Sequence, residues 1–374
     1  MVATDADTRM MQRALELAAQ GDPSPNPHVG SVVARDDQVI GEGFHSSAGL
    51  EHAEVVALRA AGEAARGATL YVTLEPCNHE GRTPPCTEAI LSAGVRRVVI
   101  GCRDPNPTVA GEGAERLRAA GIEVVIGCLE AEAKALIRPW RKYITEQMSY
   151  LGLKLAVSLD GRIATRTGAS RWITCADSRL RVQTLRAAHD AVMVGINTVL
   201  ADDPRLTVRD VPGRSPVRVV VDSKLRVPTN SQLVATAREV PTCVVTTQEA
   251  SRAVSDTLEG LGVSVIRVAS TAEGRCDMRA ALHALAVREV VSVLCEGGAE
   301  LVASLLATRL PDELHAFVAP LLLGPRGRAG AVDWAGPENP SDAPRIEPVR
   351  WELCGSDAYV SGPLVYPKKP VTAT

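Results

Sequence analysis

The sequence predicts an α/β protein built from two domains. Its 374 residues exceed the length at which a single hydrophobic core usually stops growing. Both halves alternate short apolar runs of strand length with segments of helical periodicity. The hydrophobic fraction of 45% is sufficient for two cores. We therefore expect two layered α/β domains that meet near the middle of the chain.

The first half predicts a sheet with helices on both faces. Apolar residues recur at helical spacing from Arg9 to Gln20, and Gly21 and Pro23 end that segment. The strands are expected at 29–34, 39–43, 69–74, 97–101 and 122–126. The helices are expected at 9–20, 51–65, 84–93, 113–120 and 130–144.

The second half predicts a mostly parallel sheet, because apolar strands alternate with helices. The strands are expected at 153–157, 191–194, 217–221, 242–246, 263–267, 290–294 and 314–318, with the last strands within 351–365. The helices are expected at 176–188, 249–260, 277–286 and 298–308, and an irregular loop at 324–347. The polar stretch from Tyr143 to Gly152 is interpreted as the linker, which gives domains 1–147 and 148–374.

Composition argues against a nucleic-acid-binding or membrane protein. The net charge is −3 and aromatic residues make up 3%, which disfavours both a basic DNA surface and a base-stacking platform. No apolar run reaches membrane-spanning length, and Met1 to Arg9 is too polar for a signal peptide. Nine cysteines in so long a chain indicate reduced thiols and a cytoplasmic location. The oligomeric state stays open, a homo-oligomer included.

A candidate metal motif lies between Glu51 and Cys86. His52, Cys77 and Cys86 supply one imidazole and two thiols, a zinc set that leaves the fourth position to water. Glu54 follows the histidine by two residues and is not needed as a ligand. It can instead move protons between a metal-bound water and a substrate nitrogen. The H-x-E…P-C pattern is typical of zinc-dependent nucleobase deaminases.

The spacing of the two cysteines departs from the usual C-x-x-C. Eight residues separate Cys77 from Cys86, and His79 is among them. A closed structural site with His52, Cys77, His79 and Cys86 is therefore an alternative, although a glutamate beside the histidine favours a catalytic one. We expect His52 and Cys86 near helix N-termini, where positive partial charge favours the thiolate.

The roles of three polar residues before the motif stay open. Asn26 either holds its own loop or binds the edge of a pyrimidine. His28 and His45 are interpreted as satisfied surface histidines.

A glycine-rich turn appears late in the second half. No G-x-G-x-x-G follows an early strand, which argues against a Rossmann domain. Glu296-Gly297-Gly298 instead stands between an expected strand and helix, where backbone N–H groups could receive a phosphate. The alternative is a strand-to-helix turn that merely needs small residues.

Several segments together resemble the bifunctional deaminase/reductase family of riboflavin biosynthesis, over nearly the whole chain. The resemblance implies a zinc deaminase that removes the exocyclic amine of a diaminopyrimidinone carrying a phosphoribosylamino group. It also implies a second half similar to dihydrofolate reductase, which uses NADPH to reduce the ribosyl group to ribityl. The matching segments are Asn26–Gly30, Gly41–His45, His52–Glu54, Pro76–Cys86, Asp104–Pro107, Lys154–Arg162, Ser170–Ile173 and Thr198–Thr207.

The same resemblance implies two groups of residues in the second half. Arginines suit a phosphorylated ribose because guanidinium binds phosphate bidentately, while the alternative for Arg186 is a solvated helix face. The implied cofactor contacts are Ala156, Trp172, Thr198, Asp202, Ser223, Gly298, Ala299, Glu300, Leu301, Val302, Ala303 and Ser304. The implied substrate contacts are Ser170, Arg186, Leu206, Arg209 and Glu296.

Two rival functions remain at this point. One is a nucleobase, nucleoside or RNA deaminase with an accessory domain, which would need a basic or aromatic surface that the composition does not offer. The other makes the second half a non-catalytic nucleotide-binding or assembly module, which an assay of NADPH oxidation would test.

Overall fold

The chain falls into two compact units, Met1–Gln147 and Met148–Thr374. A computed structural model describes residues 3–80, 84–107, 111–324, 330, 332 and 334–367. Both units are mixed α/β, as the sequence predicted. Within the described ranges, every helix is too short or too polar to cross a membrane.

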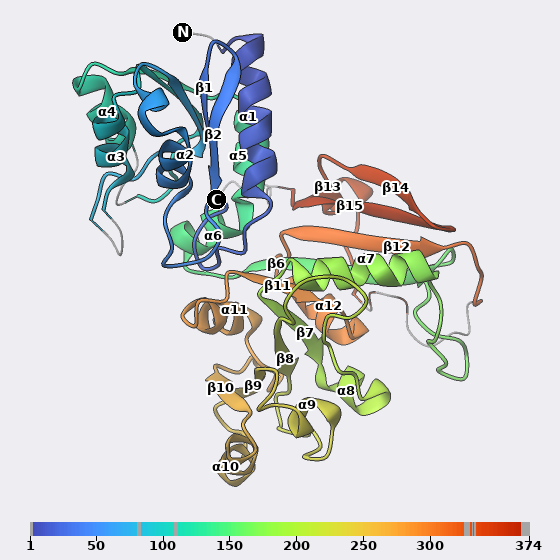
Figure 1. Cartoon of the computed structure of the whole chain (residues 1–374). Helices are drawn as coiled ribbons and strands as arrows, with labels where there is room; N and C mark the ends of the chain where they lie inside the picture. Colours follow the sequence, from blue (N-terminus) through green and yellow to red (C-terminus); the bar gives the residue numbers. More distant parts are fainter. Residues whose placement is uncertain are drawn as a thin grey trace, which may run out of the picture. The chain divides into compact units, whose positions relative to one another are not determined.

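The first unit is built on a five-stranded sheet of order β2-β1-β3-β4-β5 (Figure 1). β1 is antiparallel to both β2 and β3, whereas β3, β4 and β5 are parallel. The strands are β1 Gly30–Arg35, β2 Gln38–Phe44, β3 Thr69–Leu74, β4 Arg97–Cys102 and β5 Glu123–Ile126.

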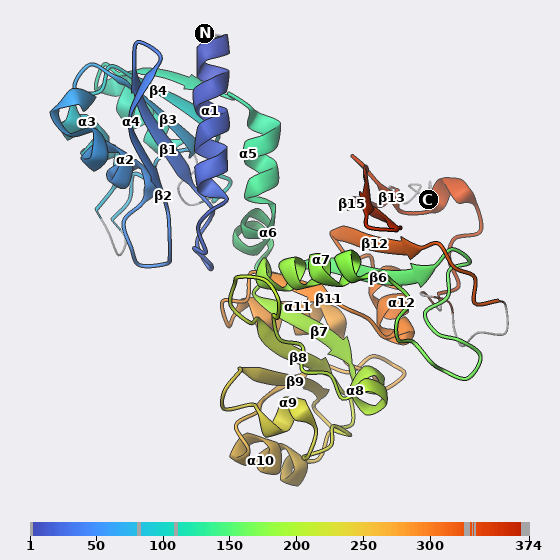
Figure 2. The same cartoon turned by 45° about the vertical axis from the view of Figure 1, so that its right-hand side comes forward.

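Helices cover both faces of this sheet. Figures 1 and 2 show α1 and α5 on one face and α2, α3 and α4 on the other. Leu70 and Val72 of β3 belong to the core under α2, and Tyr71 between them belongs to the core under α1. This is the two-residue alternation of a strand buried on both sides. The helices are α1 Asp5–Ala18, α2 Ala53–Ala61, α3 Cys86–Ala93, α4 Glu112–Ala119, α5 Glu130–Leu136 and α6 Arg138–Glu146, with a short 3₁₀ turn at Gly62–Ala65.

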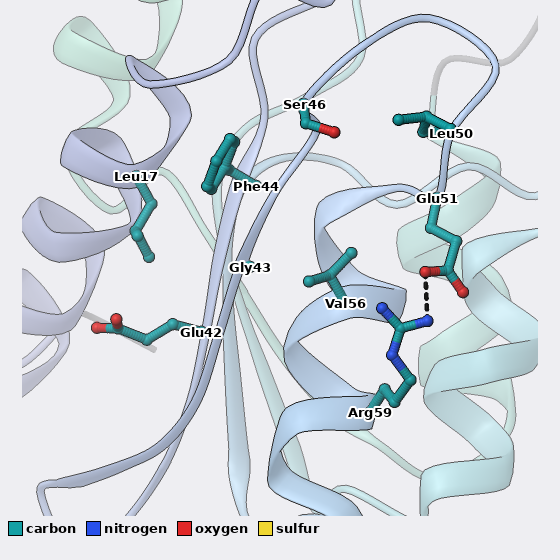
Figure 3. Close-up of a pocket in the computed structure, with 9 residues that line it drawn as sticks. All are labelled: Leu17, Glu42, Gly43, Phe44, Ser46, Leu50, Glu51, Val56 and Arg59. Carbon is teal, nitrogen blue, oxygen red and sulfur yellow. Dashed lines mark hydrogen bonds and ion pairs between the residues drawn. The ribbon is translucent and has the colours of Figure 1, made fainter.

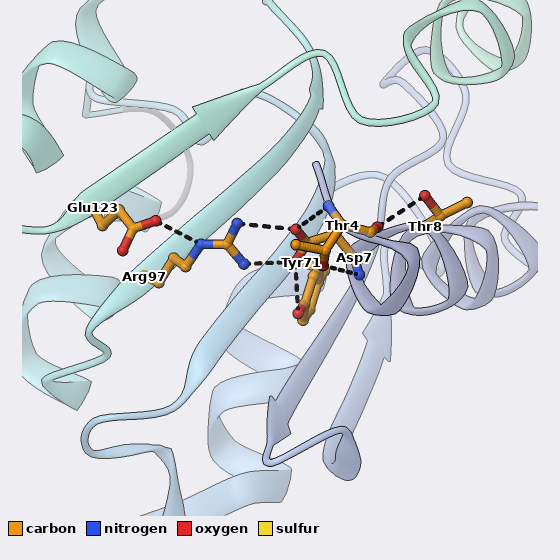
Figure 4. A network of polar contacts seen from close by, with 6 residues as sticks. All are labelled: Thr4, Asp7, Thr8, Tyr71, Arg97 and Glu123. Atoms are coloured by element: carbon orange, nitrogen blue, oxygen red, sulfur yellow. Dashed lines mark hydrogen bonds and ion pairs between the residues drawn. The ribbon is translucent and has the colours of Figure 1, made fainter. Parts of the chain in front are cut away.

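A buried ion pair fastens the start of α1 to the sheet (Figure 4). The Asp7 carboxylate accepts from Arg97 Nη1 at 2.5 Å and Nη2 at 2.9 Å, and from Tyr71 Oη at 3.1 Å. Arg97 Nε donates to Glu123 at 2.9 Å, and Thr4 closes a capping box with Asp7. Burial raises the pKa of Asp7, but the hydrogen bonds from Arg97 and Thr4 outweigh it and hold that pKa below its usual range.

The second unit contains a ten-stranded sheet of order β10-β9-β8-β7-β11-β6-β12-β15-β13, with β14 paired to β15. From β10 to β12 all neighbours are parallel, and β15, β13 and β14 add an antiparallel margin. The strands are β6 Tyr150–Ser158, β7 Ala191–Gly195, β8 Val217–Val221, β9 Thr242–Thr247, β10 Ser264–Val268, β11 Ser292–Cys295, β12 Glu313–Ala319, β13 Arg345–Ile346, β14 Arg350–Cys354 and β15 Asp357–Val365.

Two hydrophobic cores line the faces of this sheet. One core receives the apolar sides of α11 and α12, and the other receives those of α8, α9 and α10. The helices are α7 Ala176–Ala187, α8 Ile196–Asp202, α9 Gln232–Ala235, α10 Arg252–Gly260, α11 Met278–Ala286 and α12 Ala299–Ala307, with a 3₁₀ turn at Pro340–Asp342. Apart from the helix expected at 130–144, the strands and helices expected from the sequence are present, within a few residues of their expected ends. The short helices α8 and α9 were not expected.

Two expectations near the unit boundary are wrong. The helix expected at 130–144 is divided into α5 and α6 at Ile137, with Pro139 in the first turn of α6. The linker expected at 143–152 is too long: the boundary between Gln147 and Met148 lies within it, but α6 runs to Glu146 and β6 begins at Tyr150. Polar neighbours hid the fact that Tyr150 and Leu151 are buried in the second unit. Part of the loop expected at 324–347 lies outside the described residues, and its remainder contains Pro340–Asp342 and β13.

Candidate active sites

Three predicted zinc ligands meet in the first unit. His52 is the N-cap of α2, Cys77 follows the end of β3, and Cys86 is the first residue of α3. Their ligand atoms all lie within 4.8 Å of one another. Segments that are far apart in sequence are thus brought together at two helix N-termini, as expected from the strand and helix pattern.

The distances between these atoms fit a zinc ion. His52 Nδ1 lies 3.1 Å from Cys86 Sγ and 3.6 Å from Cys77 Sγ. In tetrahedral zinc, with Zn–N of about 2.0–2.1 Å and Zn–S of about 2.3 Å, nitrogen and sulfur ligands are about 3.6 Å apart. The His52–Cys77 pair matches this separation, and the His52–Cys86 pair is closer than it. One imidazole and two thiols therefore suit the metal in both chemistry and spacing, and leave a coordination position for water.

Local electrostatics favours a thiolate in this cluster. The Cys86 thiol and backbone N–H, the latter 3.3 Å from Cys77 Sγ, lower the pKa of Cys77. The same contact raises the pKa of Cys86, because one proton is shared between two sulfurs. The N–H at the start of α3 therefore favours the thiolate of Cys77, whereas the sequence argument expected this effect at Cys86.

Glu54 lies in the first turn of α2 and is 3% exposed. Burial raises the pKa of its carboxyl group, and it also hydrogen-bonds to Cys86. It does not belong to the compact set of donor atoms formed by His52, Cys77 and Cys86. A carboxyl group that touches the cluster and is shielded from bulk water is suited to carry a proton.

The interpretation of the neighbouring histidines as surface residues is wrong for His45. His45 is buried rather than on the surface, and its ring lies edge-on to that of His52 at 5.2 Å. His45 Nδ1 is 3.1 Å from the Glu51 carbonyl and its Nε2 is 3.0 Å from the Asn26 amide nitrogen. Burial lowers the pKa of His45, so the ring is neutral near pH 7. Asn26 thereby helps to orient His45, and half-buried His28 bonds to the Ala18 carbonyl at 3.1 Å.

The four-ligand alternative finds no support in the geometry. In the part of the chain that the structure describes, the donor cluster does not extend to His79, and the side chain of His79 is exposed. Residues 81–83 of the same spacer lie outside the described residues.

A separate hollow of about 510 Å³ lies among α1, β2 and α2 (Figure 3). Glu51 and Arg59 form an ion pair at its rim. None of His52, Cys77 and Cys86 lines it, so this hollow is separate from the donor cluster. Its lining residues are Leu17, Glu42, Gly43, Phe44, Ser46, Leu50, Glu51, Val56 and Arg59.

In the second unit, four expected cofactor residues lie at the carboxyl ends of neighbouring parallel strands. Ala156 is on β6, Thr198 follows β7, Ser223 follows β8 and Gly298 follows β11. These strands are adjacent in the order β8-β7-β11-β6. In open α/β sheets the ligand crevice forms at this edge.

The glycine-rich turn is built against the end of β7. Glu296 N donates to the Met193 carbonyl at 2.9 Å, and Gly195 N donates to the Gly297 carbonyl at 3.3 Å. Gly298 has φ of 96° and is the N-cap of α12. The turn therefore needs a left-handed backbone and directs helix N–H groups toward the strand ends.

The other expected cofactor residues differ in their exposure and in their contacts. Trp172 is 69% exposed and stacks under the Arg179 guanidinium at 4.6 Å. The Asp202 carbonyl accepts from Arg171 at 3.2 Å, which ties the two loops together. Leu301 and Val302 belong to a hydrophobic core. The other expected cofactor residues on α12 are Ala299, Glu300, Ala303 and Ser304, which are exposed or half-buried.

The expected substrate residues are held together by a buried ion pair. Arg186 Nε and Nη2 donate to both oxygens of Glu296 at 2.5 and 2.8 Å, and Nη1 donates to the Thr207 carbonyl at 3.0 Å. Arg186 is therefore not on a solvated helix face. Leu206 beside Thr207 is buried, and Arg209 N–H donates to Gln183 at 3.1 Å. Ser170 is half-buried in the loop before α7.

One residue of this region was not singled out from the sequence. Lys154 on β6 lies near Glu296 and Arg186, and burial lowers the pKa of its ammonium group. A lysine with a pKa perturbed by burial is a functional-site signal. The available clue was a lone cation inside an otherwise apolar strand.

Comparisons with known proteins agree with this two-part architecture. Residues 4–102 match the cytidine and deoxycytidylate deaminase zinc-binding region, and residues 149–360 match the RibD C-terminal domain. The riboflavin biosynthesis protein RibD of Aquifex aeolicus is 44% identical over 323 residues, which cover 86% of this chain and 88% of that protein.

Two solved structures cover almost the full length. RibD of Acinetobacter baumannii, form 1, has a TM-score of 0.85 at 41% identity and covers 97% of this chain and 99% of its own. A diaminohydroxyphosphoribosylaminopyrimidine deaminase/5-amino-6-(5-phosphoribosylamino)uracil reductase from Thermotoga maritima has a TM-score of 0.82 at 37% identity, covering 95% and 98%. The chain therefore belongs to the RibD family of riboflavin biosynthesis enzymes, with a cytidine-deaminase-like domain followed by a reductase domain.

Proposed function

We propose that the first unit deaminates 2,5-diamino-6-(5-phosphoribosylamino)pyrimidin-4-one hydrolytically, and that the second unit then reduces the ribosyl group to ribityl with NADPH. The observation that carries the proposal is the His52, Cys77 and Cys86 cluster with Glu54 buried against it. The name of the Thermotoga maritima relative supports this choice of substrate. Each unit would carry one of the two activities.

In the deaminase, His52, Cys77 and Cys86 would hold a zinc ion, while Glu54 would move the protons. The chemistry that zinc supplies when bound is a water acidified enough to act as nucleophile at neutral pH. Glu54 would take a proton from that water and deliver it to the departing amine, so that ammonia leaves and an oxygen takes its place. Because Glu54 is buried, bulk water would not compete for the proton.

In the reductase, the carboxyl edge of β8, β7, β11 and β6 would receive NADPH. The chemistry that NADPH supplies when bound is a hydride, and the sugar C1 would accept it. The N–H groups at the start of α12 would face the cofactor phosphates. The Arg186–Glu296 pair would fix the substrate loop, and Lys154 offers a buried proton donor beside it.

A cytoplasmic location also fits the thiols. All nine cysteines, Cys77 to Cys354, are free, which is what a reducing compartment maintains.

The test is to supply the diaminopyrimidinone phosphate to the zinc-loaded protein with and without NADPH and to identify the products by mass. Without NADPH we expect one amine to be replaced by oxygen. With NADPH we expect the same product with two further hydrogens. NADPH consumption without any change in the ribosyl group would contradict the reductase assignment, and an unchanged amine would contradict the deaminase assignment.

A further inference from the structure

Glu75 is a buried carboxylate between the last residue of β3 and the Pro76-Cys77 segment. It is 4% exposed. Its Oε2 accepts from the backbone N–H of Asp104 at 3.2 Å and of Gly111 at 3.3 Å, and its Oε1 accepts from Ala114 N–H at 3.0 Å. Three backbone donors on one buried carboxylate offset the cost of removing it from water.

The three donors belong to one segment that follows β4. Asp104 begins the Asp104–Pro107 loop, Gly111 is the N-cap of α4, and Ala114 lies in the first turn of that helix. A Cβ atom at Gly113 would lie 1.9 Å from the Pro76 carbonyl oxygen, so the helix start is packed directly on the residue before Cys77. Glu75 thus connects the metal-ligand segment to the loop after the neighbouring strand.

The loop held in this way lies beside the deaminase cluster. The Asp104 carboxylate is near enough to His79 and Cys77 to interact with their charges. Asn106 N–H donates to Asp104 Oδ1 at 2.8 Å, and two prolines stiffen the segment. Asp104-Pro105-Asn106-Pro107 is one of the segments that carry the family resemblance, but the zinc chemistry alone assigns no role to it.

We propose that Glu75 is a positioning residue of the deaminase. Its carboxylate holds the Asp104–Pro107 loop against the Cys77 segment, and that loop forms the wall on which the pyrimidine substrate is seated. The inference deepens the proposed function of the first unit and rests on it. Glu75 does not touch the reacting atoms; it acts through the loop.

Replacing the carboxylate of Glu75 with a carboxamide tests this role. Glu75→Gln keeps the size of the side chain but turns an N–H group toward backbone N–H groups, so bonds on one side are lost. The loop loosens, while His52, Cys77, Cys86 and Glu54 keep their own supports. We expect KM of deamination to rise roughly tenfold, kcat to stay within about threefold and zinc content to be unchanged.

Amide hydrogen exchange reports directly on the tether, which is the set of hydrogen bonds from the Asp104, Gly111 and Ala114 amides to Glu75. The amides of Asp104, Gly111 and Ala114 should exchange faster in Glu75→Gln than in wild type. The matched control is Glu115→Gln, which removes the same charge from the exposed side of α4, where Glu115 pairs with Arg118. The control should change neither exchange at these amides nor KM.

The possible outcomes distinguish a positioning role of Glu75 from a role in the metal site. Unchanged KM and unchanged exchange in zinc-replete Glu75→Gln would overturn the proposal, and so would loss of zinc, since Glu75 would then serve the metal site itself. If Glu75→Gln does not fold, Glu75→Asp takes its place; it keeps the charge but cannot reach all three donors, so a smaller rise in KM is expected. Should wild type fail to deaminate the substrate, the proposed function fails, whereas faster exchange at the three amides would still establish the tether.

Discussion

At the scale of single residues, the candidate deaminase site keeps the proposed metal ligands apart from the proposed proton carrier. His52, Cys77 and Cys86 bring their ligand atoms within 4.8 Å, and Glu54 lies against them without joining that set. The same separation can be made by mutation, because a carboxamide can replace the Glu54 carboxyl in shape but cannot carry a proton.

We expect Glu54→Gln to retain zinc and to lose deamination by about 10²–10⁴-fold, the usual range for general acid–base catalysis. Metal analysis and product assays on the same sample measure both. The matched variant is Cys86→Ser, which should lose zinc and deamination together while reduction continues. Near-normal turnover in zinc-replete Glu54→Gln would remove Glu54 from the mechanism.

At the scale of elements, the start of α12 is the most constrained part of the reductase edge. Gly298 has a left-handed φ, and the nearest atom to a Cβ placed there is Thr198 Oγ1 at 3.5 Å. Space is therefore available for a side chain, and the constraint is the backbone conformation itself.

Gly298→Val should weaken NADPH binding and slow reduction, because a β-branched residue resists this φ and shifts the N–H groups of the turn. Deamination should continue, so the deaminated ribosyl compound accumulates. Cofactor titration and product mass measure the two effects. Gly121→Val is a suitable control, since Gly121 also has positive φ and space for a side chain but lies in the first unit, before β5. Normal NADPH affinity in Gly298→Val would exclude the turn from the cofactor site.

A second element-scale feature is a buried histidine under α7. His315 on β12 bonds through Nδ1 to Tyr359 Oη at 2.7 Å, and Glu313, His189 and Arg181 also face it. Burial lowers the pKa of His315 to about 4. An unfolded histidine titrates near 6.5, so the unfolded chain binds more protons between these two values.

Stability of the second unit should therefore fall as the pH drops from about 6.5 to about 4, by up to roughly 3 kcal/mol from this group. Above about pH 6.5, His315 is neutral in both the folded and the unfolded state, so none of this stability is lost. Denaturant unfolding at several pH values measures it, and His315→Gln should flatten the profile in that window. An equally steep profile in the variant would assign the effect to other groups.

At the scale of the whole molecule, each set of candidate residues lies within one of the two compact units. The zinc donors and Glu54 lie within Met1–Gln147, and the reductase candidates lie within Met148–Thr374. Each unit has its own hydrophobic cores. Chains of these lengths are commonly able to fold alone.

We expect residues 1–147 and 148–374, expressed separately, to keep deamination and reduction respectively. The cut should fall between Gln147 and Met148, because Met148 belongs to a core of the second unit and Ser149 bonds to the Leu282 and Val290 carbonyls. A cut at Gly152 is the matched control, since it removes the first strand residues of β6 and should destabilise the second unit. Loss of deamination in a folded, zinc-containing 1–147 would show that the activities depend on each other.

Local patterns were enough to predict the secondary structure of both units and the donors of the zinc cluster. These patterns are properties of neighbouring residues and depend little on the rest of the fold. They are the alternation of strands, the periodicity of helices, and the glycine and proline residues that end both. The H-x-E…P-C spacing predicted His52, Glu54 and Cys77 for the same reason. Where polar neighbours masked a buried strand, as at Tyr150, the local pattern misled.

Contacts between distant segments were decided by tertiary structure alone. Arg186 and Glu296 are 110 residues apart and form a bidentate pair, and Glu75 bonds to a segment that begins 29 residues later. Burial converts His45 from an expected surface residue into a neutral neighbour of His52. The sequence by itself determined which groups could bind a metal and where strands and helices run. Strand order and burial decided which polar groups meet, because pairing and desolvation depend on the whole packed unit.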